Sequence, residues 1–152
     1  MTAGRVEAIF LFPQRRLPAV AVGAVEALAP VGLVGDRPRA RSRQVTLLGV
    51  EDWQAALRDV GGELAPVHRR ANLVVSGVRL STMLGCRLCV GDVVLVIAGE
   101  NVPCRRMDEV RAGLRSALRP DVRAGVCATI AVGGVMRIGD AVALVPDDAP
   151  SP

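Results

Sequence analysis

Short blocks of apolar residues, interrupted by glycine, proline and arginine, run along most of the chain and favour β structure. Valine dominates these blocks, and its branched side chain packs well on the surface of a sheet. We expect strands at residues 6–12, 17–25, 44–48, 73–75, 90–98 and 122–132. Gly133 and Gly134 predict a hairpin after the last of them.

Two segments carry apolar residues at helical spacing instead. Residues 51–60 begin with Glu51 and Asp52, where the helix dipole favours acids, and include Trp53, which we expect in the core. A second helical pattern follows Cys104, and we expect the C-terminal strands to surround it. Because barrel closure removes exposed strand edges, the sequence predicts a mainly β, single-domain, β-barrel-like fold with one or two short helices.

The 152 residues fit one domain, which we assign to residues 1–146, with a disordered tail at residues 147–152. No apolar run approaches the ~20 residues that a bilayer requires. The apolar N-terminal stretch is interrupted by Glu7, which argues against a secretory signal. We therefore expect a cytoplasmic protein with reduced thiols and no membrane association.

All 19 basic residues are arginine, and the formal net charge is +4. Without lysine the chain cannot form a covalent pyridoxal phosphate site. The arginine fork suits phosphate and carboxylate groups. Arg37, Arg39, Arg41 and Arg43 alternate, so an extended backbone would place them on one side, either as an anion-binding strip or as a solvated basic loop. Arg43 leads directly into a strand and should be the better fixed.

Cys104 lies in a short polar turn directly before Arg105 and Arg106. Nearby guanidinium groups lower the pKa of a cysteine thiol, and a thiolate is both a nucleophile and a soft metal ligand. We therefore predict Cys104 as the catalytic and metal-binding residue.

The other candidate ligands carry weaker signals. Cys86 and Cys89 form a C-x-x-C motif, but without a second pair the motif does not favour zinc. Cys127, inside an apolar strand, is most simply a core residue. His68 is either a catalytic base or a surface residue, and as the single histidine it excludes a histidine-rich metal site.

Six short blocks occur in the order and spacing of a known family. They are GLVGDR (32–37), RQVTLL (43–48), RANLVVSGV (70–78), RLCVGD (87–92), PCRRM (103–107) and RIGD (137–140). Across residues 5–145 the chain thereby resembles the MOSC domain. This is the C-terminal domain of molybdenum cofactor sulfurase, which also exists as small stand-alone bacterial proteins.

The resemblance implies a β-barrel-like fold that binds the molybdenum cofactor (molybdopterin), with Cys104 as a sulfur carrier or as a thiolate ligand to molybdenum. The family's motifs place cofactor-binding roles on Gly35, Asp36, Arg37, Arg43, Arg70, Asn72 and Arg105. Arg43 and Arg105 match positions suited to the pterin phosphate. Two residues depart from the pattern: Pro38 stands where many relatives have histidine, and Ala71 where glutamate is common.

Two functions follow from the resemblance. One is the reduction of N-hydroxylated compounds, with electrons from a separate flavin or iron–sulfur partner. The alternative is a sulfur-carrier or cofactor-delivery module, served by a cysteine desulfurase, without turnover of its own. Nucleic-acid binding is disfavoured, because two Phe and one Trp provide almost no stacking platform.

Overall fold

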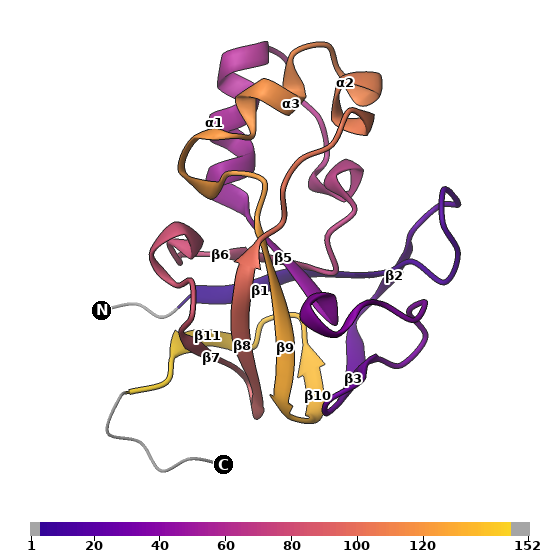
Figure 1. Cartoon of the computed structure of the whole chain (residues 1–152), viewed down its shortest axis with the longest axis vertical. Helices are drawn as coiled ribbons and strands as arrows, with labels where there is room; N and C mark the ends of the chain where they lie inside the picture. Colours follow the sequence, from indigo (N-terminus) through magenta and orange to yellow (C-terminus); the bar gives the residue numbers. More distant parts are fainter. Residues whose placement is uncertain (1–3, 147–152) are drawn as a thin grey trace.

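The computed structural model describes residues 4–146, and within them seven strands close into a barrel that carries three helices at one end (Figure 1). In hydrogen-bonding order the barrel strands are β1 (Gly4–Leu11), β11 (Ala141–Leu144), β7 (Arg87–Val90), β8 (Val93–Glu100), β9 (Val126–Val132), β5 (Val45–Gly49) and β6 (Leu73–Ser76). The predicted mainly β, barrel-like fold is confirmed. Residues 147–152, predicted as a disordered tail, lie outside the described part of the chain, and the domain limits stay a prediction.

The barrel strands pair antiparallel except β5 and β6, which run parallel with Leu47 opposite Leu73. Parallel neighbours need a crossover connection, and α1 (Val50–Val60), the helix expected at residues 51–60, provides it. The ring closes where β1 meets β11, with Gly4 opposite Val142 and Arg5 opposite Ala141.

A smaller sheet of β10 (Gly134–Arg137), β3 (Ala24–Leu28) and β4 (Gly32–Leu33) lies beside the barrel, and β2 (Val20–Val22) pairs antiparallel with the end of β1. The single strand predicted over residues 17–25 is thus divided between β2 and β3. The hairpin predicted at Gly133 and Gly134 is wrong, because β10 pairs with β3 and not with β9. A Cβ on Gly133 would lie 2.6 Å from the Ala27 carbonyl oxygen, so this glycine allows two backbones to cross closely.

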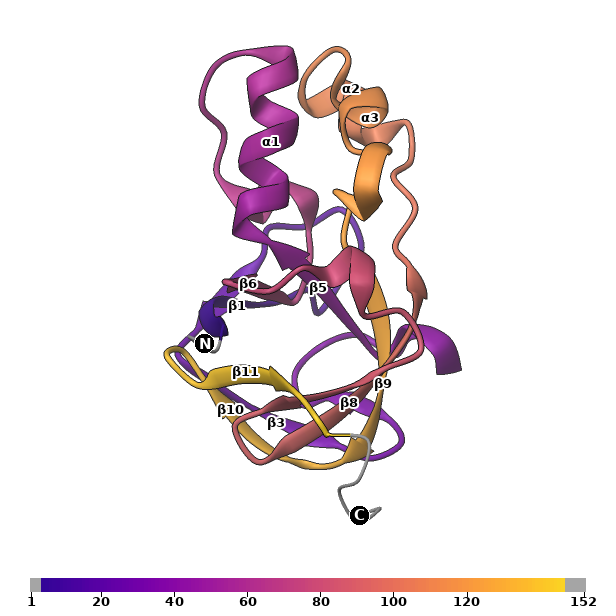
Figure 2. The same cartoon turned by 90° about the vertical axis from the view of Figure 1, so that its left-hand side faces the viewer.

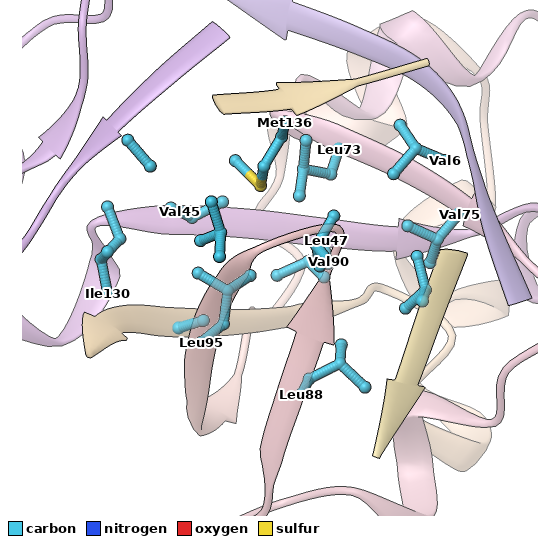
Figure 3. Close-up of a cluster of buried hydrophobic side chains, with 14 of the residues drawn as sticks. Val6, Val45, Leu47, Leu73, Val75, Leu88, Val90, Leu95, Ile130 and Met136 are labelled. Atoms are coloured by element: carbon cyan, nitrogen blue, oxygen red, sulfur yellow. The ribbon is translucent and has the colours of Figure 1, made fainter. Parts of the chain in front are cut away.

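Alternating strand residues fill the barrel interior, as expected for strands with one buried face (Figure 3). Leu47, Leu73, Leu88, Leu95 and Val6 point into this core from five different strands. The core therefore consists mainly of branched aliphatic side chains, with Met83 and Met136 among them, and no α-helix of the described residues contributes to it. The expectation that strands would surround a helix is wrong.

The helices form a second apolar cluster at the end of the barrel (Figure 2). Trp53 is buried there as predicted, and its indole N–H donates to the Leu64 carbonyl oxygen at 2.7 Å. The helical pattern after Cys104 forms two short helices, α2 (Arg106–Val110) and α3 (Leu114–Ala117). Between them Arg111 is extended and Gly113 adopts a left-handed conformation at φ +84°. Within residues 4–146, no helix is long and apolar enough to cross a membrane.

Candidate functional site

Cys104 lies between β8 and α2, and its exposed side chain lines a cavity of about 210 Å³, which we call the inner cavity. The wall of the inner cavity is formed by Arg37, Arg39, Arg43, Thr46, Arg69, Arg70, Asn101, Val102, Cys104, Arg106 and Met107. These residues come from segments far apart in the sequence. Six of them are arginines, so the thiol shares a strongly basic cavity.

Arg69 is a buried cation in the wall of this cavity. It ends the 3-10 turn Pro66–Arg69, its exposed fraction is 7%, and its guanidinium donates to the carbonyl oxygens of Ala124 (Nε, 2.9 Å) and Asn101 (Nη2, 2.6 Å). Burial lowers the pKa of Arg69 to about 10, and the nearby Cys104 opposes this shift. Arg69 therefore remains a fixed positive charge at neutral pH.

Asn101 connects Arg69 to a second arginine. Arg43 donates from Nη2 to the Asn101 side-chain oxygen at 2.7 Å, and the Asn101 backbone N–H donates to the Gly125 carbonyl oxygen at 2.8 Å. Asn101 is itself buried and comes directly after β8. Two arginines from other parts of the chain thus hold the segment that leads to Cys104.

Arg70 presents a buried donor without a partner. Its guanidinium lies over the Phe12 ring, 4.5 Å from the centroid, and its Nη1 donates to the Leu17 carbonyl oxygen at 2.8 Å. Within residues 4–146, its buried Nη2 has no hydrogen-bond partner. Burial lowers the pKa of Arg70, and repulsion from Arg106 and Arg39 adds to the effect. An anion in the cavity would satisfy this donor.

Asp36 fixes the loop between β4 and the 3-10 turn Arg41–Arg43, residues 34–40, which we call the entrance loop. Its carboxylate accepts hydrogen bonds from the Phe12 backbone N–H at 2.8 Å and from Arg39 Nε at 2.7 Å. The pKa of the neighbouring Arg37 is lowered by burial and by repulsion from Arg39, against the attraction of Asp36. In the described residues, Asp36 is the only carboxylate that forms a salt bridge with a cavity arginine.

The arginine strip is only partly as predicted. Ala40 is extended, and Arg41–Arg43 then turns as a 3-10 helix. Alternation fails across this turn: Arg37, Arg39 and Arg43 line the inner cavity, whereas Arg41 does not. The structure therefore brings three of the four strip arginines to Cys104.

Of the other predicted site residues, Arg70 also lies in the wall, whereas Arg105 is exposed and does not line it. Gly35 adopts φ +93° in the entrance loop, and a Cβ there would lie 3.0 Å from the Leu11 side chain. Asn72 is fully buried: it accepts from the Thr46 backbone N–H at 3.1 Å and donates to the Phe10 carbonyl oxygen at 3.1 Å. These bonds join β5 and β1 to the residue directly before β6. Roles in cofactor binding for these residues stay predictions.

Sequence reasoning missed Arg69, Arg106 and Asn101 as wall residues. The sequence shows adjacent arginines at 69 and 70. The residues around them give no sign that Arg69 is buried against backbone carbonyl groups more than 30 residues away. His68 is exposed and is not in the wall. In residues 4–146, no group of three or more His, Cys, Asp or Glu side chains could hold a metal ion.

The family comparison agrees with this geometry. The family model for the MOSC domain matches residues 37–143. This chain belongs to the MOSC domain family. Every residue of the inner cavity falls inside the matched range. Among curated proteins, no sequence matches the chain.

Solved structures with the MOSC chain's fold share little sequence with it. The YUAD protein from Bacillus subtilis superposes with a TM-score of 0.76 at 18% identity, covering 93% of this chain and 94% of that one. YiiM from Escherichia coli gives a TM-score of 0.71 at 15% identity, covering 97% and 72%. YiiM from Geobacillus stearothermophilus gives 0.77 at 14% identity, covering 94% and 75%. These likenesses establish the fold.

Proposed function

We propose that the inner cavity binds the molybdenum cofactor and that Cys104 supplies a thiolate ligand to molybdenum. The observation that carries the proposal is the exposed thiol of Cys104 in a cavity walled by six arginines. Molybdenum accepts soft sulfur ligands, and guanidinium groups bind phosphate in bidentate fashion. A cofactor with a terminal phosphate and a metal matches both features.

The residues present fit this group. The buried Nη2 of Arg70, unpartnered within residues 4–146, provides a donor for an anion. Cys104 is the only metal-ligating side chain of the Cys, His, Asp or Glu type in the described wall, so a metal there would need further ligands from the cofactor itself. The dithiolene of molybdopterin meets that need. When bound, the cofactor would supply a metal centre able to exchange electrons and oxygen.

The chain's own residues would bind the cofactor and orient it in the inner cavity. Arg43 and Arg70 have guanidinium groups at the wall and would hold the phosphate, as arginine does in other anion sites. Arg69, fixed by two backbone carbonyls, places a permanent positive charge near the Cys104 sulfur and would attract anionic ligands to it. The Asp36 carboxylate would keep the entrance loop in place.

The reaction we propose is the reduction of N-hydroxylated compounds to the corresponding N–H compounds and water. It consumes two electrons and two protons, and a separate flavin or iron–sulfur protein would supply the electrons. No described wall residue is a carboxylic acid or histidine, so the protons would come from water. Pro38, at the position where many relatives have histidine, is consistent with this source.

A second function is favoured by the exposure of Cys104. A sulfur-carrier thiol must reach a cysteine desulfurase and then an acceptor, and an exposed sulfur permits both encounters. The basic wall would stabilise a persulfide anion. In this role the chain would transfer sulfur without turning over a substrate.

Molybdenum and oxidised pterin should be measured on protein purified from cells that make the cofactor. We expect stoichiometric molybdenum in the wild type, loss in Cys104→Ala, and retention in the control Cys89→Ala, because Cys89 lies on β7 outside the wall. Equal molybdenum in both variants would overturn the ligand role. Absence of metal and pterin from all three, with one added sulfur on Cys104 by mass spectrometry, would establish the carrier role instead.

A further inference from the structure

A second cavity of about 450 Å³ adjoins the inner cavity, and we call it the outer cavity. Four arginines are common to both walls: Arg37, Arg39, Arg43 and Arg106. Arg15 and Arg16 line only the outer cavity. Its described wall contains no carboxylate, so six guanidinium groups surround this space. Its volume falls in the ~300–1,000 Å³ range of small-molecule sites.

The loop between β1 and β2 brings Arg15 and Arg16 to this wall. Arg70 fastens the loop through its hydrogen bond to the Leu17 carbonyl oxygen. Arg16 adopts φ +63°, a left-handed conformation that is unfavourable for a residue with a side chain. Such strain persists only where the surroundings enforce it, and it occurs often at ligand sites. The loop is therefore held in a conformation that places both Arg15 and Arg16 at the wall of the outer cavity.

The positive charge exceeds what the proposed cofactor requires. A phosphate group carries a charge of about −2, and two or three guanidinium groups are enough to bind it. Eight arginines line the two cavities together, and only Arg39 has a carboxylate partner in the described residues. The remaining charges repel one another. An additional anion would relieve this repulsion.

Arg15 and Arg16 also lie outside residues 37–143, the range matched by the family model, whereas the whole inner cavity lies within it. The outer cavity thus depends on residues beyond the matched core.

We infer that the outer cavity binds a second phosphate ester of nucleotide size, separate from the terminal phosphate of the cofactor. The inference rests on the proposed function only in assuming that the molybdenum cofactor occupies the inner cavity. The phosphate could belong to the nucleotide half of a dinucleotide form of the cofactor, or to a nucleotide substrate. In either case Arg15 and Arg16 would contact it.

Calorimetric titration with AMP and with adenosine tests the inference on the purified full chain, with and without cofactor. Wild type is compared with Arg15→Ser/Arg16→Ser and with the control Arg58→Ser/Arg119→Ser, whose residues are exposed and line neither cavity. The control removes the same charge. The nucleotide content of cofactor released by mild acid is measured in parallel.

For a nucleotide substrate, we expect AMP to bind the cofactor-loaded protein at least about tenfold more tightly than adenosine, because charge-assisted hydrogen bonds distinguish them. The Arg15→Ser/Arg16→Ser variant should lose this preference and the control should keep it. For a dinucleotide cofactor, the released cofactor should contain a nucleotide, and the same variant should retain less of it.

Two results would overturn the inference. One is cofactor without a nucleotide together with AMP binding that is absent or independent of Arg15 and Arg16. The other is a cofactor without a nucleotide, together with AMP that binds the cofactor-free protein but not the cofactor-loaded protein. That result would mean that the cofactor's own single phosphate occupies the outer cavity. If no cofactor is found, AMP binding that depends on both arginines would sustain this inference while the proposed function fails.

Discussion

The guanidinium of Arg69 donates a hydrogen bond of 2.6 Å to the backbone carbonyl of Asn101, three residues before Cys104. A second bond from the same group, to the Ala124 carbonyl oxygen, joins this segment to the approach to β9. The guanidinium of Arg69 therefore has two roles: it fixes the backbone through hydrogen bonds, and it forms part of the wall of the inner cavity. The position of the thiol therefore depends on a side chain that need not touch a ligand in the cavity.

Replacing Arg69 with Met should lower the free energy of unfolding by about 2 kcal/mol, because two buried carbonyl groups lose their donor. Relief of the buried charge offsets part of that cost. Urea denaturation at pH 7 measures the change, and the exposed Arg58→Met is the control. An unchanged midpoint for Arg69→Met would mean that the two hydrogen bonds contribute nothing to stability.

Replacing Asn72 with Ala should cost about 3 kcal/mol of folding free energy, because it leaves the buried Thr46 N–H and the half-buried Phe10 carbonyl unpaired. Thermal and urea unfolding of this variant and of the exposed Gln54→Ala measure the difference. If Asn72→Ala were as stable as wild type but bound less cofactor, the residue would have a direct binding role instead.

The four thiols should react with iodoacetamide at different rates. Cys104 is exposed, whereas Cys127 is buried, and burial raises the pKa of the Cys127 thiol, so less thiolate is present at neutral pH. Peptide mass spectrometry over a time course should show Cys104 labelled first and Cys127 last. Equal rates in the folded protein would contradict the observed burial, and labelling in urea provides the control in which the difference disappears.

Replacing Gly125 with Ala should destabilise the fold by about 3 kcal/mol or more, since the new methyl group would overlap the Leu47 carbonyl oxygen and the residue has φ +96°. Gly23→Ala is the matched control, because nothing lies within 4 Å of its Cβ position. Circular dichroism melts of both variants test the expectation. A melt of Gly125→Ala equal to that of Gly23→Ala would show that β5 and β9 can separate without cost.

Several strands and α1 were predictable because they depend on local patterns. The run at 73–75 lies in β6 and most of the run at 90–98 in β8, although the turn at Gly91–Asp92 leaves Val90 at the end of β7. The acids at the start of 51–60 favour the helix found there. Strand pairing was harder to predict, since β10 pairs with β3 across more than 100 residues. The sequence of neither strand indicates which strand it pairs with. Gly133 marked a turn, but its real constraint comes from the distant Ala27 backbone.

The same limit applied to the candidate site. Cys104 and Arg43 could be selected from their neighbours in the sequence, and both lie in the inner cavity. Arg16, Arg69 and Arg106 reach the two cavities through tertiary packing that no local spacing records. An arginine that is buried and an arginine that is solvated look identical in a sequence, because the difference lies in the carbonyl groups around them.

The meeting of β1 with β11 has a consequence during synthesis on the ribosome. The pair Gly4 and Val142 joins the first and last strands of the described chain, so the ring cannot close until nearly all of it has emerged. Contacts of such long sequence separation slow folding. Until β11 arrives, one edge of β1 stays without its partner and is open to intermolecular pairing. The nascent chain therefore depends on rapid completion of β11.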